Sequence, residues 1–238
     1  MISVMTKAGN GKVHSEDAVL CGHRIIVNET LACNVSLNSF IAVADGVGGR
    51  LAGEIASSYV LTELAKCSPV ELYEQLMAIN NQLISISNDS PAMEGMATTL
   101  SGIYIANENS FLVHIGNTRI YAMQGRYLKQ LTNDHTMYAW LISTGRFEDA
   151  ENCNRNEIIN CFGGGNNKLI DRLCISKIAN YKTMLLTSDG IHEYVSIDDL
   201  EDILNNDCDD ISKCQLIIDK AIAVGSKDDL TVVLVNIE

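Results

Sequence analysis

The sequence is poor in the residues that mark disordered chains and nucleic-acid binders. Only 2 of its 238 residues are proline and 47% are hydrophobic, which excludes disorder over most of the chain. Lysine and arginine number 17 against 30 aspartates and glutamates, a formal charge of −13, and no basic run is present. Nucleic acids and anionic membrane surfaces are therefore excluded as partners, because both are bound through positive charge. The acidic excess fits either a solvated surface or the binding of divalent cations.

Long apolar runs and closely spaced cysteines are also missing. No apolar segment approaches the roughly 20 residues that span a bilayer, and residues 1–12 contain no apolar stretch typical of a secretory signal. The 8 cysteines include no C-x-x-C pair, which excludes the usual spacing of a zinc site. We therefore expect a cytoplasmic protein whose cysteines are free thiols.

The chain shows no internal repeat, low-complexity segment or linker, so we expect a single domain over 1–238. Apolar runs rich in β-branched and aromatic residues predict strands. Short turns between them, such as Gly116-Asn117 and Gln124-Gly125, predict antiparallel hairpins. The expected strands are 18–27, 40–44, 100–106, 111–115, 119–123, 127–131, 169–175, 183–187 and 231–237.

Longer stretches with apolar residues at helical spacing predict helices between and after these strands. Ser68 and Pro69 are expected at the N-cap and first position of one helix, and Ser196 at the N-cap of another. In the last helix Leu216, Ile217, Ala221 and Ile222 are expected to face the core. This order of elements is typical of a layered α+β protein, with one sheet or two. The expected helices are 51–66, 68–83, 198–204 and 211–224.

Acidic residues stand at the ends of several predicted strands. A carboxylate at the end of a buried strand does not ionise cheaply unless a cation is close to it. Oxygen ligands without histidine or cysteine suit Mg²⁺ or Mn²⁺. Each Asp-Gly pair taken alone is more typical of a turn, so unrelated turns are the alternative interpretation. The pairs are Glu16-Asp17, Asp45-Gly46, Asp189-Gly190 and Asp228-Asp229.

Seven short motifs follow one another in a characteristic order. They are 15–18 (Ser-Glu-Asp-Ala), 44–49 (Ala-Asp-Gly-Val-Gly-Gly), 95–100 (Gly-Met-Ala-Thr-Thr-Leu), 115–119 (Ile-Gly-Asn-Thr-Arg), 131–136 (Leu-Thr-Asn-Asp-His-Thr), 187–190 (Thr-Ser-Asp-Gly) and 228–231 (Asp-Asp-Leu-Thr). In this order they resemble the motifs of the bacterial type of PPM (type 2C) metal-dependent serine/threonine protein phosphatases, and the resemblance covers nearly the whole chain. One such motif is weak evidence, whereas the ordered series is specific.

The resemblance implies a fold and a metal centre. The fold is a four-layer α-β-β-α sandwich with a central, mainly antiparallel β-sandwich and a flap segment at about 138–165. Two divalent cations, Mn²⁺ or Mg²⁺, would be bridged by Asp45, with the Gly46 carbonyl on one of them. Asp189 and Asp228 would hold the other. Each of these roles is an expectation from the family.

Further positions support this centre or depart from the family pattern. Glu16 would contact the site through water, and Asp17 would support the network. Lys12 stands where many members have a phosphate-binding arginine, so it would supply charge without a bidentate fork. Asn117 replaces an aspartate of the third metal site in bacterial relatives, which makes a third metal doubtful. Asp229 replaces an asparagine and adds an acid.

Two histidines lie in or beside the motifs. His14, next to the first acidic pair, is a candidate contact of the substrate phosphate. His135 is either a structural hydrogen-bonding group or an acid–base group, and the first interpretation is favoured because it is a lone histidine. No residue is assigned as the general acid.

These expectations describe a phosphatase acting on phosphoserine and phosphothreonine in proteins. Asp45, Asp189 and Lys12 are the expected catalytic residues, and a water activated by the cations is the expected nucleophile. The expected partners are a phosphorylated protein and an opposing serine/threonine kinase, with the enzyme acting as a monomer. Two alternatives stay open: a relative of low or no activity that binds phosphoproteins as a regulator, and a phosphatase of small phosphoesters.

Overall fold

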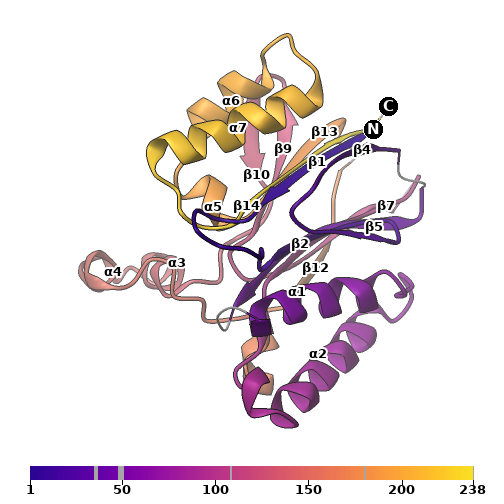
Figure 1. The fold of residues 1–238 in the computed structure, drawn as a ribbon, viewed down its shortest axis with the longest axis vertical. Helices are drawn as coiled ribbons and strands as arrows, with labels where there is room; N and C mark the ends of the chain where they lie inside the picture. The colour runs from indigo at the N-terminus through magenta and orange to yellow at the C-terminus, as the bar shows by residue number, and fades with distance from the viewer. Residues whose placement is uncertain (35–36, 48–50, 108, 180, 238) are drawn as a thin grey trace.

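The computed structural model describes residues 1–34, 37–47, 51–107, 109–179 and 181–237. In this part of the chain the strands form two antiparallel sheets, and helices cover both outer faces (Figure 1). The expected α+β, four-layer α-β-β-α sandwich is therefore confirmed. Gly48 and Gly49 of the motif 44–49 lie outside the described residues.

The first sheet brings the beginning and the end of the chain together at its centre. Within the described residues it has six strands, and β14 lies between β13 and β1. The strand order is β10 (Tyr127–Gln130), β9 (Arg119–Gln124), β13 (Thr183–Thr187), β14 (Leu230–Asn236), β1 (Ile2–Lys7) and β4 (Thr30–Cys33).

The second sheet is built around the long strand β5. Its described strands number eight, because β2 pairs with β5, and β3 with β2, beside the main path of six. The main path is β11 (Phe162–Gly163), β6 (Ala97–Thr98), β5 (Ser39–Val47), β7 (Leu100–Ile105), β8 (Phe111–Ile115) and β12 (Cys174–Lys177), with β2 (Asp17–Cys21) and β3 (Arg24–Ile26) beside it.

The run of apolar residues in β5 follows from burial of both faces of its sheet. Phe40 and Ala42 point to the helices, whereas Ile41 and Val43 point to the other sheet. Successive side chains of a strand alternate between faces, so a strand covered on both sides needs apolar residues at every position. Asp45 breaks this run near the strand's end.

Helices complete the two outer layers (Figure 1). In α2 the residues Leu72, Leu76, Ile79 and Leu83 recur every three or four positions and pack on the second sheet. Ser196 caps α6 by accepting an N–H of the first turn, as the sequence predicted. The outer helices are α1 (Leu51–Leu64) and α2 (Leu72–Asn88) on the second sheet, and α5 (Asp189–His192), α6 (Ile197–Leu204) and α7 (Asp210–Val224) on the first.

Several boundaries differ from those the sequence predicts. The expected strand 18–27 is a hairpin of β2 and β3. The expected strand 169–175 begins as a 3₁₀ turn, Asn167–Ile170, and becomes a strand only at Cys174. The second helix begins at Leu72 rather than after Ser68, because Glu71 adopts a left-handed conformation with φ of 53°.

Four strands and part of one helix face were also missed. β1, β4 and the two-residue strands β6 and β11 have no counterpart among the expected strands. In α7 the predicted inward residues Ile217 and Ala221 are buried, whereas Leu216 and Ile222 are exposed. Cys214 and Ile218 face the core beside the two buried residues.

The flap projects from the body of the sandwich (Figure 1). It contains α3 (Met137–Ser143) and α4 (Phe147–Asn152), and Thr136 caps α3 through its side chain. Among the helices that the structure describes, none has the length and apolarity that crossing a membrane requires.

Candidate metal centre

Acidic residues from both sheets meet at one edge of the sandwich. Asp17 of β2 lies directly opposite Asp45 of β5 in the antiparallel pairing. Asp189 begins α5 directly after β13, and Asp228 lies just before β14. Burial, and then the nearby carboxylates of Asp189, Asp17, Asp228 and Asp229, raise the pKa of Asp45 well above its usual range. The strand-ending acids that the sequence singled out therefore share one neighbourhood.

Two threonines fix the position of Asp45. Its backbone N–H donates to Thr99 Oγ1 at 2.9 Å, and its carbonyl accepts bonds from Thr98 Oγ1 and the Thr99 N–H, each at 2.9 Å. Both threonines belong to the motif 95–100, from which no role was predicted for them. The sequence feature that could have revealed this role is two adjacent hydroxyl residues in an otherwise apolar segment. In the structure they lie in and next to β6, which pairs with β5, so their side chains can reach Asp45.

Gly46 allows the backbone to approach helix α1 closely. A Cβ atom at Gly46 would collide with the backbone of Gly53, and one at Gly53 would collide with Glu16 Oε1. The Gly46 N–H donates to the Glu16 carbonyl at 3.1 Å. Glu16, Gly46 and the start of α1 are therefore packed together, with no space for a larger residue at position 46.

Asn117 orients Asp189. Its Nδ2 donates to Asp189 Oδ2 at 3.0 Å, while its own Oδ1 is buried without a partner among the described residues. Burial and the charge of Asp228 raise the pKa of Asp189 to about 6. An amide at position 117 can thus hold one carboxylate oxygen and still offer an oxygen of its own.

Several buried oxygens at this edge have no hydrogen-bond partner among the described residues. They are both carboxylate oxygens of Asp17 and Oε1 of Glu16. Burial raises the pKa of Asp17 to about 7, with the charges of Asp229 and Asp189 adding to the effect, and burial also raises the pKa of Glu16. Buried oxygens of this kind are costly unless a cation or a water binds them.

The donor set fits hard divalent cations, although the carboxylates do not form a closed cage. In the described ranges, no three histidine, cysteine, aspartate or glutamate side chains stand as a preformed set of metal ligands. The all-oxygen chemistry and the unpartnered oxygens are nevertheless those that Mn²⁺ or Mg²⁺ requires.

One cation of the chain itself lies among the acids. The Lys12 ammonium is 2.8 Å from Asp228 Oδ1, 3.0 Å from Asp229 Oδ2 and 3.6 Å from Glu16 Oε2. Although burial opposes it, hydrogen bonding to Asp228 and Asp229 raises the pKa of Lys12 above its usual value. Lys12 is thus charged and turned towards the carboxylates, and its expected contact with a substrate phosphate stays a prediction.

The two histidines lie in different environments. The His14 side chain is 74% exposed and 3.9 Å from Glu54 Oε2, on the outside of its loop. His135 is buried, and its Nδ1 accepts the Gly116 N–H at 3.1 Å. Burial, and then the adjacent His114, lower the pKa of His135 to about 4, so its ring is neutral. This arrangement orders the turn before Asn117.

The motifs 115–119 and 131–136 join through an ion pair at the base of the flap. The Arg119 guanidinium contacts both carboxylate oxygens of Asp134 at distances of 2.6 to 3.1 Å. A groove of about 690 Å³ lies beside this pair, and Tyr138, Trp140 and Arg172 contribute to its lining. The flap therefore borders an open groove with a mixed polar and apolar lining.

Comparison with known proteins gives relatives of one kind. No family model matches the chain. The serine/threonine phosphatase stp of Listeria welshimeri is 31% identical over 210 residues, which cover 82% of this chain and 83% of that protein. The crystal structure of the Mycobacterium tuberculosis serine/threonine phosphatase PstP/Ppp superposes with a TM-score of 0.81 at 26% identity, covering 100% of this chain and 98% of that one. The PstP catalytic domain in complex with two manganese ions gives a TM-score of 0.77 at 26% identity, with 99% and 97% coverage.

Proposed function

The chain belongs to the bacterial metal-dependent serine/threonine protein phosphatases of the PPM family, and we propose that its acidic edge is the catalytic metal centre. Asp45 would be shared by two divalent cations, with the Gly46 carbonyl beside it. Asp189 and Asp228 would complete the set for one ion. Bound in this way, divalent cations would lower the pKa of water and offset the charge of a phosphoryl group.

Other residues of the chain hold this set in place. Thr98 and Thr99 fix the backbone of Asp45, and Asn117 fixes one oxygen of Asp189. Asp17 and Glu16 supply oxygens for waters around the ions, which would satisfy atoms that otherwise lack partners among the described residues. The unpartnered, mutually repelling carboxylates are the observation that carries the proposal, because a protein without ions gains nothing from such a cluster.

The test is turnover of a phosphothreonine peptide with Mn²⁺, comparing wild type, Asp189→Asn and the exposed control Asp202→Asn. We expect Asp189→Asn to lose about 100-fold or more in kcat/KM, because a metal ligand is removed. The control should keep wild-type activity. Equal rates for wild type and Asp189→Asn would remove Asp189 from the metal centre.

Calorimetry separates catalysis from binding alone. Tight binding of Mn²⁺ without turnover would support a regulator that binds phosphoproteins. Faster turnover of p-nitrophenyl phosphate than of several phosphopeptides would instead favour small phosphoesters. We further propose that 1–238 is one domain that acts as a monomer in the cytoplasm against the products of a serine/threonine kinase.

A further inference from the structure

The loop that carries Lys12 is fixed to the segment that carries Asp228 and Asp229. The Gly9 N–H donates to Asp229 Oδ1 at 2.7 Å, and the Lys12 N–H donates to the Gly9 carbonyl at 3.0 Å. A Cβ atom at Gly9 would collide with the backbone of Lys227 and Asp228. Backbone contacts therefore fix the position of the Lys12 main chain, so the direction of the Lys12 side chain does not depend on its own ion pairs alone.

The Lys12 ammonium donates hydrogen bonds to the carboxylates of Asp228 and Asp229 and lies 3.6 Å from that of Glu16. It has three N–H groups and three acidic neighbours, Asp228, Asp229 and Glu16. The Lys12 side chain is only 34% exposed, so the ammonium is partly withdrawn from water. Its position is that of a counter-ion built into the acidic edge.

Asp229 differs from the other two acids because the chain itself satisfies it. It is 3% exposed, and its carboxylate accepts the Gly9 and Glu16 N–H groups at 2.7 and 2.8 Å as well as the Lys12 ammonium. Asp228 is half exposed, and Glu16 keeps Oε1 unpartnered among the described residues. Asp229 is thus a permanent anchor, whereas Asp228 and Glu16 can exchange partners.

We propose that Lys12 is an internal counter-cation that competes with a divalent ion for Asp228 and Glu16 and so sets the affinity of the centre for its metal. The proposal rests on the proposed function of this edge. Two cations within a few ångströms repel each other, so an ion at Asp228 displaces the ammonium towards Asp229. The lysine lowers metal affinity and in return stabilises the metal-free protein.

The test compares wild type with Lys12→Met, which keeps the length of the side chain and removes its charge. Calorimetry without substrate should give an Mn²⁺ Kd about tenfold lower for Lys12→Met, a ratio at the small end of typical coupling between sites. The melting temperature of the metal-free variant should be lower than that of wild type, because the carboxylates lose their counter-ion. A gain in Mn²⁺ affinity combined with a loss of metal-free stability is diagnostic of competition.

Two controls separate this effect from general electrostatics. Lys227→Met removes an equal charge from an exposed neighbour of Asp228, and it should change the Kd far less. Lys12→Arg keeps the charge and should keep a Kd near that of wild type. If Lys12→Met does not fold without metal, Lys12→Gln replaces it in the same comparison.

Two outcomes contradict the inference. An Mn²⁺ Kd that is unchanged or raised in both Lys12→Met and Lys12→Gln overturns competition while leaving the metal centre intact. If folded wild type, Lys12→Met and Lys12→Arg all fail to bind Mn²⁺, the proposed metal centre is itself wrong, and the competition is wrong with it.

Discussion

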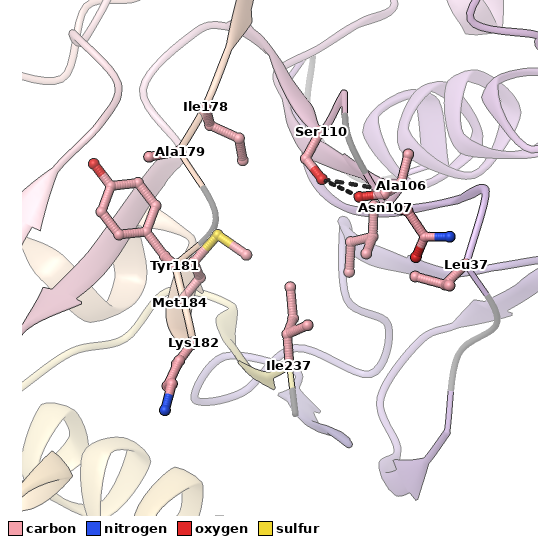
Figure 2. A pocket seen from close by; sticks show the side chains of 11 residues that line it. Leu37, Ala106, Asn107, Ser110, Ile178, Ala179, Tyr181, Lys182, Met184 and Ile237 are labelled. Carbon is pink, nitrogen blue, oxygen red and sulfur yellow. Dashed lines mark hydrogen bonds between the residues drawn. The ribbon is translucent and has the colours of Figure 1, made fainter.

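The two ends of the β-sandwich are formed by the same strands. They differ in whether their buried polar groups have hydrogen-bond partners. β13 has Met184 near one end and is followed by Asp189 at the other. At the Met184 end, apolar side chains line a cavity of about 390 Å³ (Figure 2). Its buried Ser110 is satisfied, since the hydroxyl donates to the Ala106 carbonyl at 2.9 Å and accepts the Ala106 N–H at 3.1 Å.

At the Asp189 end, by contrast, buried carboxylate oxygens lack partners among the described residues. Leaving a buried polar group without a partner costs stability, and the Ser110 hydroxyl at the apolar end avoids that cost. The comparison teaches that this fold accepts unsatisfied carboxylate oxygens at the end where ions would bind. The following predictions test the contrast.

The largest effect is expected for Asp45→Asn. Removing the shared ligand should lower kcat/KM by about 1000-fold or more. The metal-free protein should become more stable to urea, because a buried carboxylate with a raised pKa is replaced by a neutral amide. The exposed control Asp171→Asn should change neither quantity. A loss of metal-free stability in Asp45→Asn would show that the carboxylate is not under electrostatic strain.

The stability of the protein should depend on pH through His114, because this ring is buried and burial disfavours its charged form. Ser101 Oγ lies 2.8 Å from its Nδ1, and its Nε2–H donates to the Asn133 carbonyl at 2.8 Å. Burial lowers the pKa of His114 from 6.5 to about 4. Between these values the unfolded chain binds the proton and the folded protein does not, so stability falls as the pH drops through this window. The full difference corresponds to about 3 kcal/mol.

Urea unfolding at several pH values in EDTA measures this effect as the difference between wild type and His114→Gln. The exposed His23→Gln is the control and should keep the wild-type pH dependence. An identical pH dependence in wild type and His114→Gln would mean that the pKa of His114 is the same in the folded protein as in the unfolded chain.

At the apolar end, Met184→Ala should cost about 2–3 kcal/mol of unfolding free energy. Met184 is 1% exposed and packs between the sheets, but it already borders a cavity, so the low end of the usual range applies. Activity per folded molecule should be unchanged. A large loss of kcat/KM at full occupancy by Mn²⁺ would show that the two ends are coupled.

The smallest effect is expected for Ser110→Ala, which removes the hydroxyl that bridges the Ala106 backbone groups. The loss should be about 1 kcal/mol, since two modest bonds are lost and water can replace part of them. Urea unfolding measures it, and Ser176→Ala on the exposed strand β12 is a matched control. A cost equal to that of the control would mean that the bridge contributes nothing.

The sequence predicted the elements whose pattern is local. The strand 183–187 was correct to the residue, and the acids at strand ends were located because they interrupt apolar runs. The predicted inward face of α7 was wrong in part. Two overlapping apolar stripes run along this helix, and packing on the first sheet buries Cys214 and Ile218 rather than Leu216.

Contacts between distant segments could not be predicted. β1 forms a strand because it pairs with β14, which is more than 200 positions away in the sequence. The direction of Lys12 depends on the bond between Gly9 and Asp229, which are 220 positions apart. No local pattern encodes such a contact, so a lysine at position 12 could be expected near phosphate but not among the acids.

The central place of β14 has a consequence for the timing of assembly during translation. This strand lies between β13 and β1, and Asp228 and Asp229 immediately precede it. A nascent chain that still lacks it has a first sheet split in two and holds only part of the acidic edge. The proposed ligand set is therefore complete only after β14 has left the ribosome, and a translation product that ends before Asp228 should have no phosphatase activity.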